Sequence, residues 1–149
     1  MSTNVFTTIA KGLSRSMHEG QLYGGRPYSY HIDCVVAKVN FMYGESPRLS
    51  ELQQVAYLHD ILEDTELTDE VLHEMRFAED VVDAVVAISK VDGEDLFDYY
   101  DRVASNKLAF KVKVADTMSN LEHSCRESQT KRIFKYTKQL QELYARKEK

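Results

Sequence analysis

The sequence is poor in the two residues that most often interrupt regular structure. Of its 149 residues, six are glycine and two are proline. Few turns are therefore expected, and helices are favoured. The apolar fraction of 43% is ordinary, and the chain is long enough to bury a substantial core. Because no repeat, low-complexity tract or linker is found, we expect a single domain over residues 1–149.

Cysteine, targeting signals and long apolar runs are also scarce. With two cysteines, Cys34 and Cys125, and no basic-then-apolar leader, we expect reduced thiols in a cytoplasmic protein. No apolar run approaches the ~18–20 residues that span a bilayer, so no membrane segment is expected. The net charge of −5 disfavours a broad surface for extended nucleic acid or for anionic lipid.

Apolar residues spaced three and four apart predict an all-α chain. Gly44 is expected to end one helix, Ser50 and Gln53 to form a capping box, and Thr68 to cap a short helix. The β-branched segment 77–89 also fits a strand, but its spacing favours a buried helix. We expect a compact bundle of six to eight helices, with helical patterns over residues 4–16, 28–43, 50–63, 71–75, 77–89, 95–104, 107–124 and 130–146, and a glycine-rich loop over 19–27.

Ionisable side chains gather where the third of these patterns ends, in the sequence His-Asp-Ile-Leu-Glu-Asp. On a continuous helix, His59 stacks with Glu63 and Asp60 with Asp64, because residues four apart share a face. Four titratable groups in six positions are costly to bury without a partner, and a metal ion is such a partner. For Glu63 and Asp64 alone, a solvated helix end is the simpler interpretation.

Two further segments contribute candidate ligands. Asp116 and Asn120 lie four apart on a helix with an apolar face, where Asp116 fits a satisfied core carboxylate and a metal ligand equally well. A lone histidine near the start of a helix, such as His31, is more often structural or exposed than a metal ligand. Its assignment as a ligand depends on the other candidates. Two imidazoles and two carboxylates form a mixed nitrogen and oxygen set that suits one divalent metal.

Together these segments resemble the HD-domain metal phosphohydrolases. Within them the sequence is most similar to the hydrolase domain of the RelA/SpoT family and to the small alarmone hydrolases, which include metazoan SpoT homologues. The resemblance covers about residues 15–125, and its motifs are Pro27-Tyr28-x-x-His31, Leu58-His59-Asp60-Ile61-Leu62-Glu63-Asp64-Thr65, and Val112-Lys113-Val114-Ala115-Asp116 followed by Asn120.

The resemblance implies a role for each matching position. One divalent ion, usually Mn²⁺ in this family, would be held by His31, His59, Asp60 and Asp116. Glu63 and Asp64 would orient or activate the attacking water, and Asn120 would contact the nucleotide or the ligands. Lys90 and Lys113 are weaker candidates for phosphate contacts, with solvated lysines as the alternative. Fe²⁺, Co²⁺ or Zn²⁺ suit the same donors.

The sequence departs from the family where the base is recognised. Alarmone hydrolases typically carry Arg-Lys eight to nine positions before the first metal histidine, and here these positions hold Leu22 and Tyr23. Tyr23 could still stack on a purine, since an aromatic face accepts any base. Arg26 lies nearby but out of register. The metal chemistry is therefore retained, whereas the identity of the nucleotide is left open.

Three functions remain open at this point. The first is removal of the 3′-pyrophosphate of guanosine-3′,5′-bis(diphosphate), (p)ppGpp, or of a related phosphorylated nucleotide. The second is an HD-domain nucleotidase or phosphodiesterase with another nucleotide substrate, and the third is a non-catalytic regulatory module stapled by its metal. The basic amphipathic helix at 130–146 is expected to pack with a solvated face. Its alternatives are a rim that attracts the substrate and a contact in a homo-oligomer.

Overall fold

The computed structural model describes residues 4–147, which form nine helices and one two-stranded hairpin. The all-α class predicted from the sequence is confirmed. The elements are α1 (Val5–Met17), β1 (Leu22–Tyr23), β2 (Arg26–Pro27), α2 (Tyr28–Tyr43), α3 (Leu49–Leu58), α4 (Ile61–Asp64), α5 (Asp69–Glu74), α6 (Glu79–Ile88), α7 (Leu96–Ala104), α8 (Lys107–Arg126) and α9 (Thr130–Lys147).

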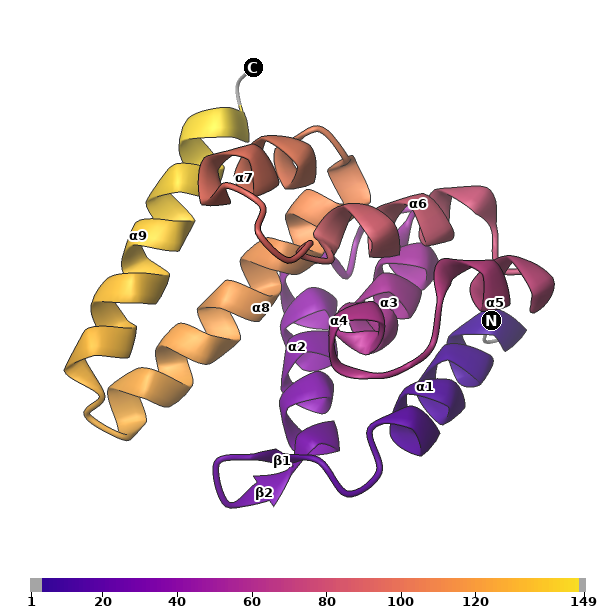
Figure 1. The fold of residues 1–149 in the computed structure, drawn as a ribbon, viewed down its shortest axis with the longest axis horizontal. Helices are drawn as coiled ribbons and strands as arrows, with labels where there is room; N and C mark the ends of the chain where they lie inside the picture. The colour runs from indigo at the N-terminus through magenta and orange to yellow at the C-terminus, as the bar shows by residue number, and fades with distance from the viewer. Residues whose placement is uncertain (1–3, 148–149) are drawn as a thin grey trace.

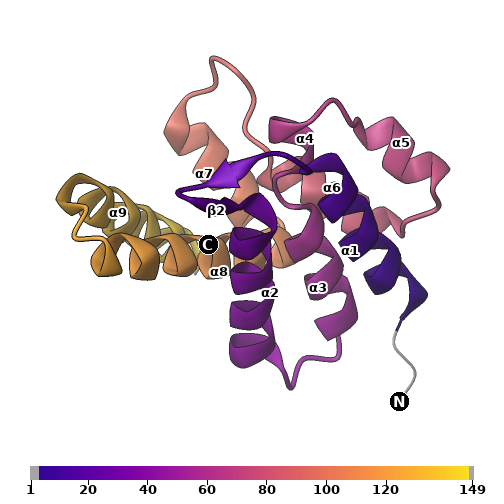
Figure 2. The ribbon, with the colours of Figure 1, turned by 90° about the horizontal axis from the view of Figure 1, so that it is seen from below.

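The 20-residue helix α8 runs through the molecule and contacts α2, α3, α6, α7 and α9. Figures 1 and 2 show α9 lying alongside α8, so that the two helices form a hairpin that extends from the body built by α1–α6. The body is held by a core of fully buried aliphatic side chains, including Val39, Leu52, Leu58 and Ile61. Burial of each such side chain stabilises the fold by roughly 1.5–3 kcal/mol relative to exposure.

The helix predicted over residues 50–63 is divided in two. Helix α3 ends at Leu58, α4 begins at Ile61, and the His59-Asp60 pair forms the break. The carbonyl of Ala56 would accept the amide of Asp60 in a continuous helix. Here it accepts a 2.7 Å hydrogen bond from Nδ1 of His59 instead. The ring of His59 thus takes over a backbone partner at the point where the helix breaks.

Two of the three predicted helix boundaries differ in their capping from the structure. The Ser50 capping box is wrong, because α3 begins at Leu49 and the hydroxyl of Ser50 lies 3.1 Å from that of Thr7. Thr68 does precede α5, but its side chain makes no capping hydrogen bond. Gly44 follows the last residue of α2 as predicted. The segment 77–89 is a helix, with Val81 and Val85 fully buried on its inner face.

The glycine-rich segment is a short antiparallel hairpin rather than a plain loop. Tyr23 pairs with Arg26, and Gly24 turns the chain between them with a φ of 61°. Such a left-handed conformation costs glycine little and favours it at a two-residue hairpin turn. The hairpin leads directly into α2 and contacts it. Within residues 4–147, none of the helices is both long and apolar enough to cross a membrane.

Candidate active site

The four side chains predicted as metal ligands converge between three parts of the fold. His31 comes from the first turns of α2, His59 and Asp60 from the break between α3 and α4, and Asp116 from the middle of α8. Oδ1 of Asp116 lies 3.0 Å from Nε2 of His31 and 3.4 Å from Nε2 of His59. Oδ2 of Asp60 lies 3.1 Å from Nε2 of His59 and 3.9 Å from Nε2 of His31.

The donor atoms fit a divalent cation. His31, His59 and Asp116 are 2–4% exposed, and one ligand atom from each lies within 4.8 Å of the others. Because Nδ1 of His59 donates to Ala56, Nε2 carries a lone pair whenever the ring is neutral, and this buried atom has no hydrogen-bond partner. A lone pair facing carboxylates is repelled unless a cation or a proton lies between them. The cluster is therefore built to attract positive charge.

The local electrostatics agree. Burial lowers the pKa of His59, but the charges of Asp60 and Asp116 more than offset burial, so that this pKa lies well above its ordinary value. Burial likewise raises the pKa of Asp116, and the charges of Lys113 and His59 outweigh burial, so that this pKa lies well below its ordinary value. The carboxylate of Asp116 is accordingly ionised and available as a ligand.

Further hydrogen bonds orient the two carboxylates. The hydroxyl of Tyr28 donates to Oδ2 of Asp60 at 2.5 Å, and Nζ of Lys113 donates to Oδ2 of Asp116 at 3.1 Å. Nδ2 of Asn120 donates to Oδ1 of Asp116 at 3.1 Å, as expected for two residues one helical turn apart. Such outer partners fix ligand geometry in metal sites.

Glu63 and Asp64 belong to the short helix α4. They line a cavity that is also lined by the candidate ligands His31, Asp60 and Asp116. Partial desolvation by the surrounding protein raises the pKa of Glu63 and also that of Asp64. The carboxylate of Glu63 accepts a hydrogen bond from the backbone amide of Lys90, in the loop after α6. Both carboxylates therefore lie beside the histidine and aspartate cluster.

The lining of the cavity carries charges of both signs. The cavity has a volume of about 210 Å³, and three lysines, Lys90, Lys113 and Lys135, line it together with the carboxylates. Lys135, Tyr136 and Gln139 reach it from α9 and were missed as site residues in the sequence. Their positions share one face of a helix, a signal also expected for simple packing. The lysines offer charged donors to a phosphate.

Tyr23 closes one side of this cavity. Its ring stacks on that of His31, with centroids 4.5 Å apart and planes 15° apart, and its hydroxyl donates to Oδ1 of Asn120 at 2.5 Å. The sequence predicted that this ring could stack on a base, whereas in the structure it lies against a candidate metal ligand. Arg26 lies outside the cavity, with its guanidinium 4.3 Å from the ring centre of Tyr30.

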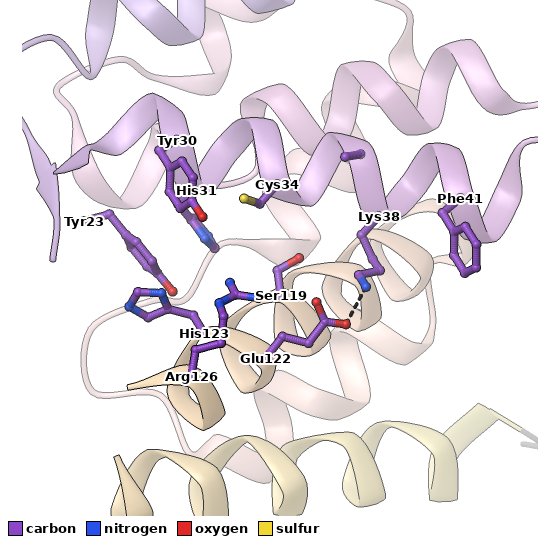
Figure 3. A pocket seen from close by; sticks show the side chains of 11 residues that line it. Tyr23, Tyr30, His31, Cys34, Lys38, Phe41, Ser119, Glu122, His123 and Arg126 are labelled. Atoms are coloured by element: carbon purple, nitrogen blue, oxygen red, sulfur yellow. Dashed lines mark hydrogen bonds and ion pairs between the residues drawn. The ribbon is translucent and has the colours of Figure 1, made fainter. Parts of the chain in front are cut away.

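A second cavity of about 320 Å³ lies between α2 and α8, on the far side of Tyr23 and His31 (Figure 3). Ser119 and Cys34 line it, and the Oγ of Ser119 is buried without a hydrogen-bond partner. Cys34 is half-buried, and its thiol forms no disulfide. A 2.5 Å ion pair between Lys38 and Glu122 crosses one end of the cavity.

Comparison with known proteins identifies the fold. No family model matches the sequence, and no curated protein matches it. Among solved structures, this chain is similar to a metazoan ortholog of SpoT, a protein described as hydrolyzing ppGpp and playing a role in starvation responses. It aligns with a TM-score of 0.77 and 18% sequence identity, over 98% of this chain and 87% of that one. With His31, His59 and Asp116 gathered in its centre, this chain has the HD-domain fold that its motifs resemble.

Proposed function

We propose that this protein is a metal-dependent phosphohydrolase that acts on a phosphorylated nucleotide. The single observation that carries the proposal is the make-up of one cavity. A cluster of ligand atoms that attracts a cation, a pair of carboxylates with raised pKa values and three lysines all face it. Groups with shifted pKa values that share a cavity are typical of catalytic sites.

The residues that would hold the metal are His31, His59, Asp60 and Asp116. The family resemblance favours Mn²⁺, and the donor set also suits other divalent ions. When bound, such an ion supplies a water of lowered pKa and neutralises charge on the phosphate. Hydrogen bonds to Asp60 from Tyr28 and to Asp116 from Lys113 would keep the carboxylates in place.

The remaining residues would bind the phosphates and handle protons. Lys90, Lys113 and Lys135 attract the phosphates to the cavity. Glu63, held by the Lys90 amide, accepts the proton of the attacking water as general base. Asp64, next to Glu63 on α4 and also lining the cavity, would provide a proton to the departing oxygen. Attack at phosphorus then breaks one phosphorus–oxygen bond and forms another.

The substrate we favour is (p)ppGpp, from which the 3′-pyrophosphate would be released. Support comes from the motifs and from the shared fold with a protein described as hydrolyzing ppGpp. A second candidate is another nucleotide, and it is favoured by Tyr23, which occupies the base-contact position and lies on His31. Glu63 and Asp64 argue against a purely regulatory module, because neither carboxylate is needed merely to hold an ion.

A substrate screen tests this proposal. The purified protein is supplied with Mn²⁺ and incubated separately with ppGpp, ppApp, NADPH, deoxynucleoside triphosphates and nucleoside monophosphates. Release of phosphate and pyrophosphate is followed for each. We expect turnover of at least one 3′-phosphorylated nucleotide, with ppGpp preferred. Turnover confined to another class would support the second candidate, and binding of Mn²⁺ without any turnover would contradict the enzymatic function.

A further inference from the structure

The loop between α6 and α7, residues 89–95, accepts hydrogen bonds from one side chain of α7. Arg102 donates from Nη2 to the carbonyl of Ser89 at 2.6 Å and from Nε to the carbonyl of Ala87 at 3.3 Å. Its Nη1 donates to Oε2 of Glu94, near the other end of the loop. The planar guanidinium thus joins the two ends of the loop, an arrangement that lysine cannot reproduce.

The middle of the loop is held by hydrogen bonds within the loop itself. Val91 is 63% exposed, so the loop has no apolar anchor at that position. Gly93 has a φ of 80° in a turn closed by the 3.1 Å hydrogen bond from the amide of Glu94 to the carbonyl of Val91. The amide of Val91 also donates to Oε1 of Glu94 at 3.2 Å. Glu94 therefore links Arg102, with which it forms an ion pair, to Val91 in the middle of the loop.

The same loop reaches the candidate active site through Lys90. Its backbone amide donates to Oε1 of Glu63, the proposed general base. Its ammonium lines the cavity and lies 5.5 Å from the ring centre of Tyr99. Arg102 and Lys113 lie 5.4 and 5.7 Å from that ring centre. The buried ring of Tyr99 is thus common to Arg102 and to two lysines of the cavity.

We infer that Arg102 is a positioning residue for the reaction: it holds the 89–95 loop so that the Lys90 amide fixes the Glu63 carboxylate. Arg102 does not line the cavity and so acts through the loop. The assignment rests on the proposed role of Glu63 as general base. A displacement of about 1 Å in a reacting group can lower a rate about a hundredfold, so a remote clamp of this kind matters for turnover.

Hydrogen exchange of the Lys90 amide tests the clamp without any need for turnover. The full-length Arg102→Met variant is compared with wild type and with Arg146→Met. Arg146 is a matched control, because it too makes three hydrogen bonds, to Asp101 and Glu142. We expect exchange at Lys90 to become about tenfold faster in Arg102→Met and to stay unchanged in Arg146→Met, with the amides of α8 unaffected in both.

A double-mutant cycle tests whether Arg102 acts through Glu63. We expect Arg102→Met to lower kcat about tenfold in the wild-type background and to have no further effect in Glu63→Ala. Unchanged exchange at Lys90 in a folded Arg102→Met protein would overturn the assignment, as would an equal loss of kcat in both backgrounds. If Arg102→Met fails to fold, Glu94→Gln gives the same decision, with faster exchange at Lys90 expected. If no substrate is found, the exchange experiment still decides.

Discussion

The hydroxyl of Tyr23 donates a 2.5 Å hydrogen bond to Oδ1 of Asn120, a residue 97 positions further along the chain. The same ring lies flat against His31. Because Asn120 also donates to Asp116, one side chain of the hairpin is linked to two proposed metal ligands. Tyr23 thus contacts the proposed ligands and lines both the cavity of the site and the second cavity, between α2 and α8 (Figure 3).

Substitutions of Tyr23 separate the effect of its ring from that of its hydroxyl. In Tyr23→Ala the His31 ring loses its stacking partner, and we expect Mn²⁺ affinity to fall about tenfold, in the range found for outer partners of metal ligands. Tyr23→Phe keeps the stack and loses only the hydrogen bond to Asn120, which itself contacts a single ligand, so its affinity should fall less than that of Tyr23→Ala. Calorimetric titration with Mn²⁺ measures both. Equal affinities for Tyr23→Ala and wild type would contradict an orienting role.

Metal binding is expected to stabilise the fold, because the four ligands come from segments that unfolding separates. At a free Mn²⁺ concentration one hundred times Kd, the gain is about 2.7 kcal/mol. For a chain of this size that gain raises Tm by roughly 5–10 °C. The Asp116→Asn variant should lose most of this increase. Asp80→Asn, at an exposed ion pair with Arg48, should keep it. A similar rise in Asp116→Asn, measured by thermal unfolding, would place the ion elsewhere.

Glu63→Gln tests the general base. Glutamine has nearly the same shape and retains an oxygen for the Lys90 amide, so folding and Mn²⁺ binding should persist while kcat falls about 10²–10⁴-fold. Partial desolvation raises the pKa of Glu63 above its ordinary 4.5, so the wild-type rate should fall as pH drops through that raised value and Glu63 becomes protonated. This acidic limb should be absent from the variant. A pH–rate profile with the same limb in both proteins would assign the base elsewhere.

Lys135 tests the contribution of α9 to substrate binding. In Lys135→Met one positive charge leaves the lining of the cavity, and we expect KM for the phosphorylated substrate to rise about tenfold, a loss of about 1.4 kcal/mol in binding free energy. Lys138→Met removes the same charge one turn further along the helix, outside the cavity. Its KM should stay near the wild-type value. Equal effects of the two substitutions on initial-rate kinetics would indicate general attraction rather than a specific contact.

Much of the fold could be predicted from local patterns. Gly44 ends α2 where the sequence predicted, and the valines of α6 form a helix because their spacing leaves one face buried and Val86 42% exposed. The break at His59 could not be predicted, because an uninterrupted apolar pattern runs through it. At the break the His59 ring bonds the carbonyl of Ala56, three residues earlier, and the apolar pattern gives no sign of this contact.

The candidate site divides in the same way. The residues that carry chemistry stand out by type and spacing, as with His59, Asp60 and Asp116. By contrast, Lys135 reaches the cavity only because α9 folds back along α8 (Figure 1), and its sequence context is that of any basic amphipathic helix. The contacts of Arg102 with the loop could not be predicted from the sequence either, since its partners include two backbone carbonyls.

The measurement that tests the central claim most directly is hydrolysis of ppGpp in ¹⁸O-labelled water, with Mn²⁺ present and then chelated. Hydrolysis by the proposed site predicts that pyrophosphate or phosphate is released with one ¹⁸O atom per turnover. Release should stop on chelation, return with Mn²⁺, and be absent in Asp116→Asn. If the fully Mn²⁺-loaded protein releases no labelled product, or if chelation leaves the rate unchanged, the proposed metal-dependent hydrolysis of this substrate is wrong.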